Sequence, residues 1–376
     1  MRLAHRPGSP ERARPAKAPT TARGAEPARR RRRNQLAAVG AALLATGTGI
    51  LAGAGSAAAG SAPSGQVALV AYSTPAPAYD ALIKAFQATS EGKNVTFTTS
   101  FGPSGSQSRS VAAGLPADVV NFSLATDMER LVKAKLVSPS WNADPTTHGM
   151  VTNSVVVFVV PKGNPEHVKT WADLVKSNTR VFTPNPFSSG SARWNLMAAY
   201  GAELKLGQSA SNAQSFLRTL LTKTVVQDTS AATELQAFLQ DESSNKNDVL
   251  LDYEDDAIQA ERAGRPISYV IPPQTILIQN PIAVTANSKN SAAAQAFVSF
   301  LLSPAGQEQW ARLGYRPVRP TVAAQFRKKF PDPPNHGLFT IQYLGGWDQV
   351  ATTFFGTKTG VVTQIEQSLG ASTSSS

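Results

Sequence analysis

The sequence predicts an α/β fold with a largely parallel sheet, and three observations support this prediction. Strand-like runs of β-branched and apolar residues alternate with helix-like segments along most of the chain. Runs of small hydroxyl and glycine residues lie between several strands and the helices that follow them. The chain has 376 residues, 41% of them hydrophobic, so it can bury a substantial core and form two lobes.

The first part of the chain predicts the order β-α-β-α-β. After the first strand, Ser73-Thr74-Pro75 pairs a capping hydroxyl with a proline early in the first helical turn. After the second strand, the turn over 102–107 opens another helix. In order, we expect a strand over 67–72, a helix to Phe86, a strand over 94–99, a helix that carries Val111 and Leu115, and a strand over 118–122.

The second part continues this alternation to residue 313. A nearly continuous apolar run over 154–160 predicts a buried strand, and residues 371–376 form a polar tail with no core potential. The expected elements are strands over 154–160, 180–183, 224–227 and 249–252, a strand pair over 276–278 and 282–284, and helices over 171–174, 192 onward, 233–240, 291–302 and 306–313.

The first 60 residues form a basic leader. They hold 11 of the 36 Lys and Arg and 2 of the 25 Asp and Glu, which leaves 25 basic and 23 acidic residues in the rest, too balanced for a nucleic-acid-binding stripe. A basic run over 29–33, an uncharged stretch over 36–52 and small residues to Ala59 have the order of a secretory signal peptide, so we expect export and cleavage near Ala59. An uncleaved anchor, a basic arm and a twin-arginine route over 32–36 remain alternatives.

The chain contains no cysteine. This excludes disulfides, cysteine nucleophiles and thiolate metal sites, and also a lipid-attached cysteine, so another device would have to hold the protein at a cell surface.

The sequence does not predict an enzyme, a cofactor or a metal site. Of the four histidines, His5 lies in the leader, and the other three, His148, His167 and His336, lie in expected loops without a metal-ligand spacing or a neighbouring nucleophile. A ferric-ion binder that uses tyrosinates is an alternative of the same lobed architecture, but no adjacent tyrosine pair marks such a site.

Three turns share one design, in which a strand ends and small residues open a helix. They lie at Ser73-Thr74, at 104–106 and at 188–191. The first turn of a helix has unpaired amide donors and the positive end of the helix dipole, and open α/β sheets bind ligands at the carboxyl ends of their strands. Each turn alone is typical of a plain helix cap, whereas three in one chain favour a shared anion site.

The sequence resembles the periplasmic sulfate- and thiosulfate-binding proteins that feed ABC importers, from about Val67 to Trp347. Residues 185–194, Asn-Pro-Phe-Ser-Ser-Gly-Ser-Ala-Arg-Trp, are similar to the family's Asn-Pro-Lys-Ser-Ser-Gly-Gly-Ala-Arg-Trp, and 102–107 look like its Gly-Gly-Ser-Gly-Lys-Gln. Further segments match the family in order at 117–120, 162–165, 303–307, 315–317 and 345–347.

This resemblance implies a two-lobed, venus-flytrap fold of type II with parallel-rich sheets flanked by helices. It implies a monomeric binding protein that captures sulfate or thiosulfate and delivers it to a membrane permease and ATPase complex. Another tetrahedral oxyanion, such as molybdate, tungstate or phosphate, is the alternative ligand. The expected divisions are a leader over 1–60, a first lobe over 65–153 plus 281–345, a second lobe over 154–280, a C-terminal segment over 346–370 and a tail over 371–376.

The resemblance also implies the residues that contact the anion. Ser73 stands where the family has aspartate and Ser191 where it has glycine, but the contact there is a main-chain amide, so we expect little effect. The implied contacts are the backbone amides of Ser73, Ser189, Gly190, Ser191 and Ala231, the hydroxyl of Ser104, and the side chain of Tyr253.

Tyr253 departs from the family, which has a donor-only tryptophan indole at this position. A phenol both donates and accepts, so Tyr253 either replaces the indole as a donor, or accepts the proton of hydrogen phosphate and weakens discrimination against it, or leaves room for a water. We expect Arg193 to bind neighbouring carbonyls or a carboxylate rather than the anion, and the acids over 254–256 to prefer a helix N-terminus rather than a metal.

Overall fold

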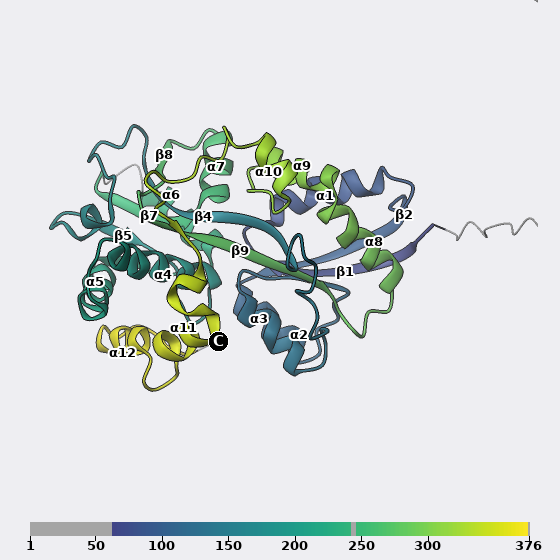
Figure 1. The fold of residues 1–376 in the computed structure, drawn as a ribbon, viewed down its shortest axis with the longest axis horizontal. Helices are drawn as coiled ribbons and strands as arrows, with labels where there is room; N and C mark the ends of the chain where they lie inside the picture. Colours follow the sequence, from purple (N-terminus) through teal and green to yellow (C-terminus); the bar gives the residue numbers. More distant parts are fainter. Residues whose placement is uncertain (1–61, 242–245, 375–376) are drawn as a thin grey trace, which may run out of the picture. The chain divides into compact units, whose positions relative to one another are not determined.

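The computed structural model describes residues 62–241 and 246–374, and the fold is described for these residues alone. The basic leader lies outside them, so the expected cleavage near Ala59 stays a prediction. In the described part of the chain, ten strands form one sheet in the order β2-β1-β3-β9-β4-β7-β5-β6, with β10 beside β9 and β8 beside β4 (Figure 1). The strands are β1 (Ser64–Tyr72), β2 (Asn94–Gly102), β3 (Val119–Asn121), β4 (Met150–Pro161), β5 (Arg180–Phe182), β6 (Thr224–Val226), β7 (Asp248–Tyr253), β8 (Ile267–Val270), β9 (Thr275–Val284) and β10 (Leu338–Phe339).

Helices follow most of these strands, as the alternating pattern predicts. The helices are α1 (Ala76–Gln87), α2 (Ser104–Ala112), α3 (Ala125–Lys133), α4 (Gly190–Lys205), α5 (Ala210–Thr222), α6 (Ala231–Asp241), α7 (Glu254–Arg262), α8 (Ser291–Leu302), α9 (Pro304–Leu313), α10 (Pro320–Gln325), α11 (Gly346–Phe355) and α12 (Val361–Ser368), with short 3-10 helices at Trp171–Val175 and Ile341–Leu344.

The sheet has two parallel halves joined by an antiparallel middle. In the first half, β1 pairs in parallel with β2 and β3, and in the second half, β5 pairs in parallel with β6 and β7. Between them β9 pairs antiparallel with β3 and β4, and β4 pairs antiparallel with β7 (Figure 1). The prediction of parallel pairing is therefore correct in the halves but not in the middle, because β4 carries the chain into the second half and β9 carries it back.

Each half has its own hydrophobic core. In the first half, β1 and α1 pack against α8 and α9, with Leu82, Phe86, Phe297 and Trp310 fully or almost fully buried. In the second half, one cluster joins α4, α5 and the strands, and a second lies around Phe182 and Phe238 on the other face. These cores hold the strand ends, and hence the turns that follow them, in fixed positions.

Two expectations differ from the structure. The residues predicted as a strand pair over 276–278 and 282–284 form one strand, β9, because the carbonyl of Pro281 still accepts from the backbone of Phe122 at 3.0 Å. Leu115 lies beyond α2 and is 37% exposed, since the helix ends at Ala112. The helix expected over 171–174 is present as the 3-10 helix Trp171–Val175.

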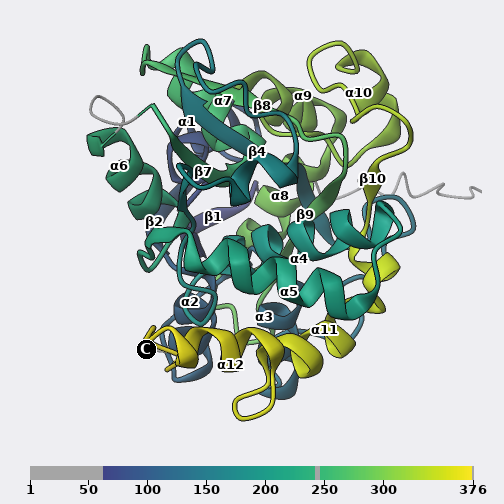
Figure 2. The same ribbon diagram turned by 90° about the vertical axis from the view of Figure 1, so that its left-hand side faces the viewer.

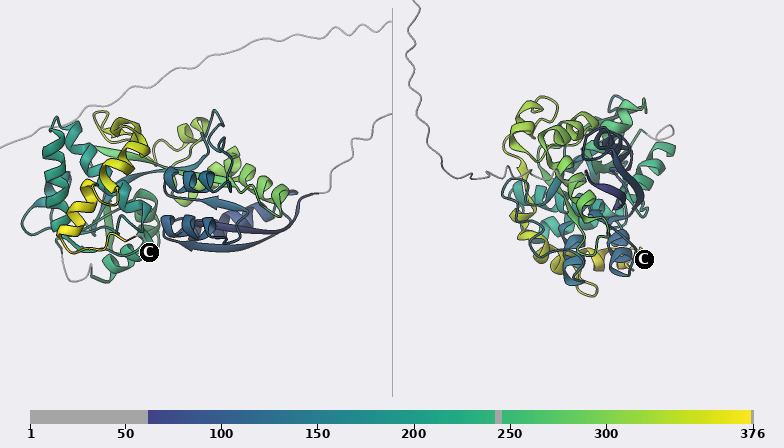
Figure 3. Two further views of the ribbon diagram at one scale, coloured as in Figure 1. Left: turned by 90° about the horizontal axis from the view of Figure 1, so that it is seen from below. Right: turned by 90° about the vertical axis from the view of Figure 1, so that its right-hand side faces the viewer.

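Helices after residue 313 were missed, and two of them cover the second half. α12 lies beside α5 (Figures 2 and 3). Val350, Phe354 and Ile365 of α11 and α12 belong to the same hydrophobic cluster as residues of α4 and α5. The start of the tail lies beside the turn that precedes α4, because the side-chain amide of Asn185 donates to the carbonyl of Ser372 at 2.8 Å.

Candidate functional site

A small cavity lies where strands from both halves end. Its empty volume is about 180 Å³. All seven residues expected from the sequence to contact an anion line this cavity. The lining residues are Tyr72, Ser73, Thr74, Pro103, Ser104, Ser123, Ser189, Gly190, Ser191, Ser230, Ala231 and Tyr253.

Several helices begin at the small cavity. Ser104, Gly190 and Ala231 are the first residues of α2, α4 and α6, and Tyr253 directly precedes α7. The first N–H groups of a helix have no partner within it, and the aligned peptide dipoles place about half a positive charge at that end. The cavity therefore gathers unpaired backbone donors and positive potential without a charged side chain in its lining.

The turn before α4 is fixed by Asn185. The side-chain oxygen of Asn185 accepts from the backbone N–H of Phe187 at 2.8 Å, and its carbonyl accepts from the N–H of Ser189 at 2.9 Å. Arg193 closes the turn by donating to the carbonyl of Pro186 at 2.7 Å, which confirms its expected role with carbonyls. The next two amides, of Gly190 and Ser191, then open the helix at the cavity.

Gly190 must be a glycine because the chain passes close to Ser123 at this point. A β-carbon on Gly190 would lie 2.4 Å from the hydroxyl oxygen of Ser123 and 2.6 Å from its β-carbon. Any side chain would push α4 away from the loop that follows β3. The amide of Gly190 is thus held against the opposite half of the molecule.

Two atoms expected to contact the anion are already paired inside the protein. The hydroxyl of Ser104 donates to Asp127 Oδ2 at 2.7 Å and accepts from the N–H of Ser123 at 3.0 Å. The N–H of Ser189 donates to Asn185, whereas its hydroxyl lies 2.8 Å from the hydroxyl of Ser191. The backbone N–H of Ser104 remains available, and the hydroxyl of Ser189 can donate to the cavity when it accepts from Ser191. We therefore take these two atoms as candidate donors, in place of the Ser104 hydroxyl and the Ser189 N–H expected from the resemblance.

The phenol of Tyr253 is also paired. Its oxygen lies 2.6 Å from Ser123 Oγ, and Tyr253 is fully buried. Burial raises the pKa of the phenol well above its ordinary value, so the proton stays on the oxygen at neutral pH. Ser123 was not among the expected residues, because the strand that precedes it ends without the Gly-Ser run that marks the other turns.

Buried carboxyl groups lie behind the cavity wall. Asp256 accepts from the hydroxyl of the lining residue Thr74 at 3.0 Å, and Asp252 accepts from the N–H of Tyr253 at 2.8 Å. Burial raises the pKa of Asp256 to about 7 against the opposing effect of the Thr74 hydrogen bond. Burial, followed by the neighbouring Asp256, raises the pKa of Asp252 and Asp255 well above the ordinary range. The raised pKa values favour the uncharged forms of Asp252 and Asp255, which lowers the negative charge behind the cavity wall.

Residues 254–256 lie in the first turn of α7, as their acidity predicts. Glu254 forms a buried two-point ion pair with Arg316, with nitrogen–oxygen distances of 2.6 and 3.0 Å. Within 62–241 and 246–374, no group of three or more His, Cys, Asp or Glu side chains is arranged to hold a metal ion.

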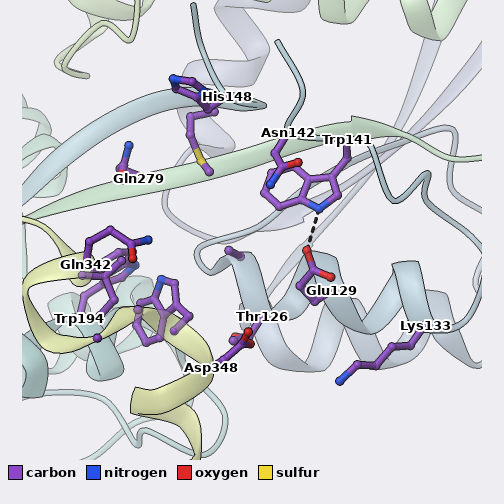
Figure 4. Close-up of a pocket in the computed structure, with 16 residues that line it drawn as sticks. Thr126, Glu129, Lys133, Trp141, Asn142, His148, Trp194, Gln279, Gln342 and Asp348 are labelled. Atoms are coloured by element: carbon purple, nitrogen blue, oxygen red, sulfur yellow. Dashed lines mark hydrogen bonds between the residues drawn. The ribbon is translucent and has the colours of Figure 1, made fainter. Parts of the chain in front are cut away.

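A larger hollow lies elsewhere, with an empty volume of about 1,610 Å³. α3, the loop before β4, and the segment around Trp347 line this large hollow, and its side chains include Lys133, Glu129 and Trp141 (Figure 4). Trp141 donates to Glu129 at 2.9 Å, as the dashed line shows. Trp194 borders the large hollow and donates to the carbonyl of Ser123 at 3.0 Å, so one side chain links the walls of the two cavities.

Comparisons with known proteins show the family to which the chain belongs. The family model described as "Bacterial extracellular solute-binding protein" matches residues 67–316. The chain is 38% identical to the sulfate-binding protein of Synechococcus elongatus over 77% of its own length and 84% of that protein. It is 33% identical to the sulfate-binding protein of Escherichia coli over 77% and 90%, and 34% identical to the thiosulfate-binding protein of Pseudomonas aeruginosa over 81% and 94%.

Solved structures show the same fold. The sulfate-binding protein SubI from Mycobacterium tuberculosis H37Rv is similar with a TM-score of 0.72 and 44% identity, over 76% of this chain and 97% of that one. A periplasmic thiamin binding protein is similar with a TM-score of 0.57 at 20% identity, over 76% and 95%, which concerns the fold alone.

Proposed function

We propose that this chain, which belongs to the bacterial extracellular solute-binding protein family, captures sulfate or thiosulfate in the small cavity and delivers it to an ABC importer. One observation carries the proposal. Donors from the starts of α2, α4 and α6 converge on one small cavity that lies beside both halves of the sheet. The match to sulfate- and thiosulfate-binding relatives supports the same ligand class.

The chemistry of the cavity suits a fully ionised, dehydrated dianion. The donors we propose are the backbone N–H groups of Ser73, Ser104, Gly190, Ser191 and Ala231, with the hydroxyl of Ser189. Amide donors at helix starts offset the negative charge through aligned dipoles rather than through an ion pair. A protonated oxyanion needs an acceptor for its proton, and an unpaired proton would cost about 1 to 3 kcal/mol.

A second ligand class remains open on the same geometry. Molybdate and tungstate are tetrahedral dianions that use the same donors as sulfate. The size of the anion and the number of hydrogen-bond acceptors in the cavity wall therefore decide which oxyanion binds. Hydrogen phosphate needs an acceptor for its proton, and the cavity wall offers mainly donors, with hydroxyl lone pairs as its acceptors; one lone pair of the Tyr253–Ser123 pair is already used. We therefore expect phosphate to bind more weakly than sulfate.

Closure around the anion is proposed to use the antiparallel middle of the sheet. β4 pairs with β9 over Met150–Val155 and with β7 over the residues that follow, so it belongs to both halves. We place the hinge at 152–155 and 276–281, between a first lobe over 65–153 plus 281–345 and a second lobe over 154–280. The permease would then recognise the closed form.

Export is part of the proposal, with the signal peptide cleaved near Ala59. Every helix within the described ranges 62–241 and 246–374 is too short or too polar to cross a membrane. We propose that the mature protein acts as a monomer outside the cytoplasm, and that it binds its ligand without catalysing a reaction.

Calorimetric titration tests the proposed function. The protein, truncated before Ser61 and dialysed free of sulfate, is titrated with sulfate, thiosulfate, molybdate and phosphate in turn. We expect 1:1 binding of sulfate or thiosulfate, with phosphate at least about 100-fold weaker. Absence of binding to all four anions would overturn the proposal, whereas tighter binding of molybdate or phosphate would change the ligand and keep the site.

A further inference from the structure

Tyr72 carries a buried hydroxyl that no described residue satisfies. It is the last residue of β1 and is 3% exposed, and its hydroxyl has no hydrogen-bond partner within 62–241 and 246–374. Leaving a buried hydroxyl unpaired is unfavourable, and native proteins contain few such groups. We therefore expect this hydroxyl to form a hydrogen bond with a bound molecule rather than with another residue.

The position of Tyr72 indicates that partner. Tyr72 lines the small cavity beside Ser73, and its ring lies 6.1 Å from the ring of Tyr253, which lines the same cavity. Although β1 belongs to the first half, Tyr72 packs in the hydrophobic cluster of the second half. The side chain thus lies where the two halves meet around the ligand.

Other buried tyrosines of the chain have partners. Tyr79 donates to Asn121 Oδ1 at 3.0 Å, Tyr315 donates to the carbonyl of Thr74 at 3.2 Å, and Tyr253 is 2.6 Å from Ser123 Oγ. The unpaired state of Tyr72 is therefore not shared by these three tyrosines. Tyr72 is the phenol at the cavity whose oxygen has no hydrogen-bond partner among the described residues, whereas the resemblance directed attention to Tyr253.

We propose that the hydroxyl of Tyr72 is a further contact of the bound anion, to which it donates a hydrogen bond. This inference rests on the proposed function and adds a residue to its site. Burial raises the pKa of Tyr72 well above its ordinary value, so the phenol keeps its proton at neutral pH and serves as a donor. Tyr72 thus adds a side-chain donor from the first half to the donors that the second half supplies, most of them at the start of α4.

Tyr72→Phe removes the hydroxyl and keeps the ring, and Tyr79→Phe is the matched control away from the cavity. Calorimetry with sulfate, or with the anion that the wild type prefers, is expected to show Tyr72→Phe binding about 10- to 100-fold more weakly, the range for a hydrogen bond to a charged group. The thermal midpoint of ligand-free Tyr72→Phe is expected to equal or exceed the wild-type midpoint, since the hydroxyl has no partner to lose. Tyr79→Phe is expected to do the opposite, with a lower midpoint and unchanged affinity.

Two results would overturn the inference. One is an affinity of Tyr72→Phe within about twofold of a wild type that does bind the anion, whatever the midpoint. The other is an equal loss of affinity in Tyr79→Phe, which would show that any lost core hydroxyl weakens binding. A wild type that binds no oxyanion would instead refute the proposed function, so the two failures are distinguishable.

Discussion

The small cavity and the large hollow differ in size by almost an order of magnitude, with empty volumes of about 180 and 1,610 Å³. The large hollow is lined by exposed and partly exposed side chains such as Lys133, whereas the small cavity is lined by the starts of helices. On the proposed function, the site of a small dehydrated ion is distinguished by the convergence of donors rather than by volume. Four predictions test this difference between the two cavities.

The largest effect is expected from Gly190→Ala in the small cavity. The added β-carbon would meet Ser123 at 2.4 Å and displace the first turn of α4, so several hydrogen bonds to the anion weaken together. We expect a loss of about 100-fold or more in sulfate affinity by calorimetry.

Gly201→Ala is the control for Gly190→Ala within the same helix. Its β-carbon would meet the ring of Phe339 at 2.3 Å, away from the cavity. Overpacking of this kind costs about 1 to 3 kcal/mol of stability, so this variant is expected to lower the thermal midpoint and to keep its affinity. Equal affinity losses in both glycine variants would show that binding does not depend on the close approach of Gly190 to Ser123.

Ser189→Ala is expected to weaken sulfate binding by about 10- to 100-fold, since it removes the proposed hydroxyl donor. Ser188→Ala is its neighbour control, because that hydroxyl donates to the carbonyl of Thr229 at 2.9 Å and not to the cavity. Calorimetry on both variants tests the reassignment of donors. If Ser188→Ala lost more affinity than Ser189→Ala, the donor would not be the Ser189 hydroxyl.

A smaller effect is expected from pH, through Asp256 behind the cavity wall. Burial raises its pKa to about 7, above the value of about 4 in an unfolded chain. The raised pKa contributes stability that is present below about pH 4 and is lost as pH rises towards about 7. A dianion nearby raises the pKa further, so binding takes up a proton and affinity falls by about threefold to tenfold from about pH 6 to about pH 8.

Asp256→Asn tests this pH dependence because it mimics the protonated carboxyl and keeps an acceptor for Thr74. Sulfate titrations across the same pH range are expected to show a flat affinity in this variant. An unchanged slope would assign the proton to another group, with Asp252 and Asp255 as the neighbours to change next.

The smallest effect is expected in the large hollow. Lys133→Ala removes an exposed positive charge there, and solvent screens that charge from the small cavity. We expect sulfate affinity within about twofold of wild type at physiological salt. A tenfold loss would show that the large hollow takes part in binding, against the comparison drawn above.

The sequence predicts the parts of the fold that local patterns encode. Strand and helix order, the turn at Asn185 and the role of Arg193 follow from short-range signals such as proline, glycine and hydroxyl runs. The antiparallel pairing of β4 with β9 was missed, because it joins segments more than 120 residues apart and neither strand shows its partner in its own sequence.

The choice of donor atoms follows the same rule. The seven expected residues line one cavity. The hydroxyl of Ser104, however, donates to Asp127 on the neighbouring helix α3 and not to the cavity. No spacing within 102–107 reveals that acceptor. Tyr72 was missed for a related reason, since an aromatic residue at the end of a strand is typical of a core position.

The dependence of the small cavity on main-chain amides has a consequence for genetics. Replacing Ser73 or Ala231 by another small residue leaves the backbone amide in place. An alanine scan would therefore show little loss of affinity at most positions of the site. Selection can therefore change these side chains freely while it holds the path of the backbone. Ligand specificity of this kind depends on the path of the backbone. In a mutational survey, the positions expected to be sensitive are Gly190, the turn residue Asn185 and the few residues whose hydroxyls reach the cavity.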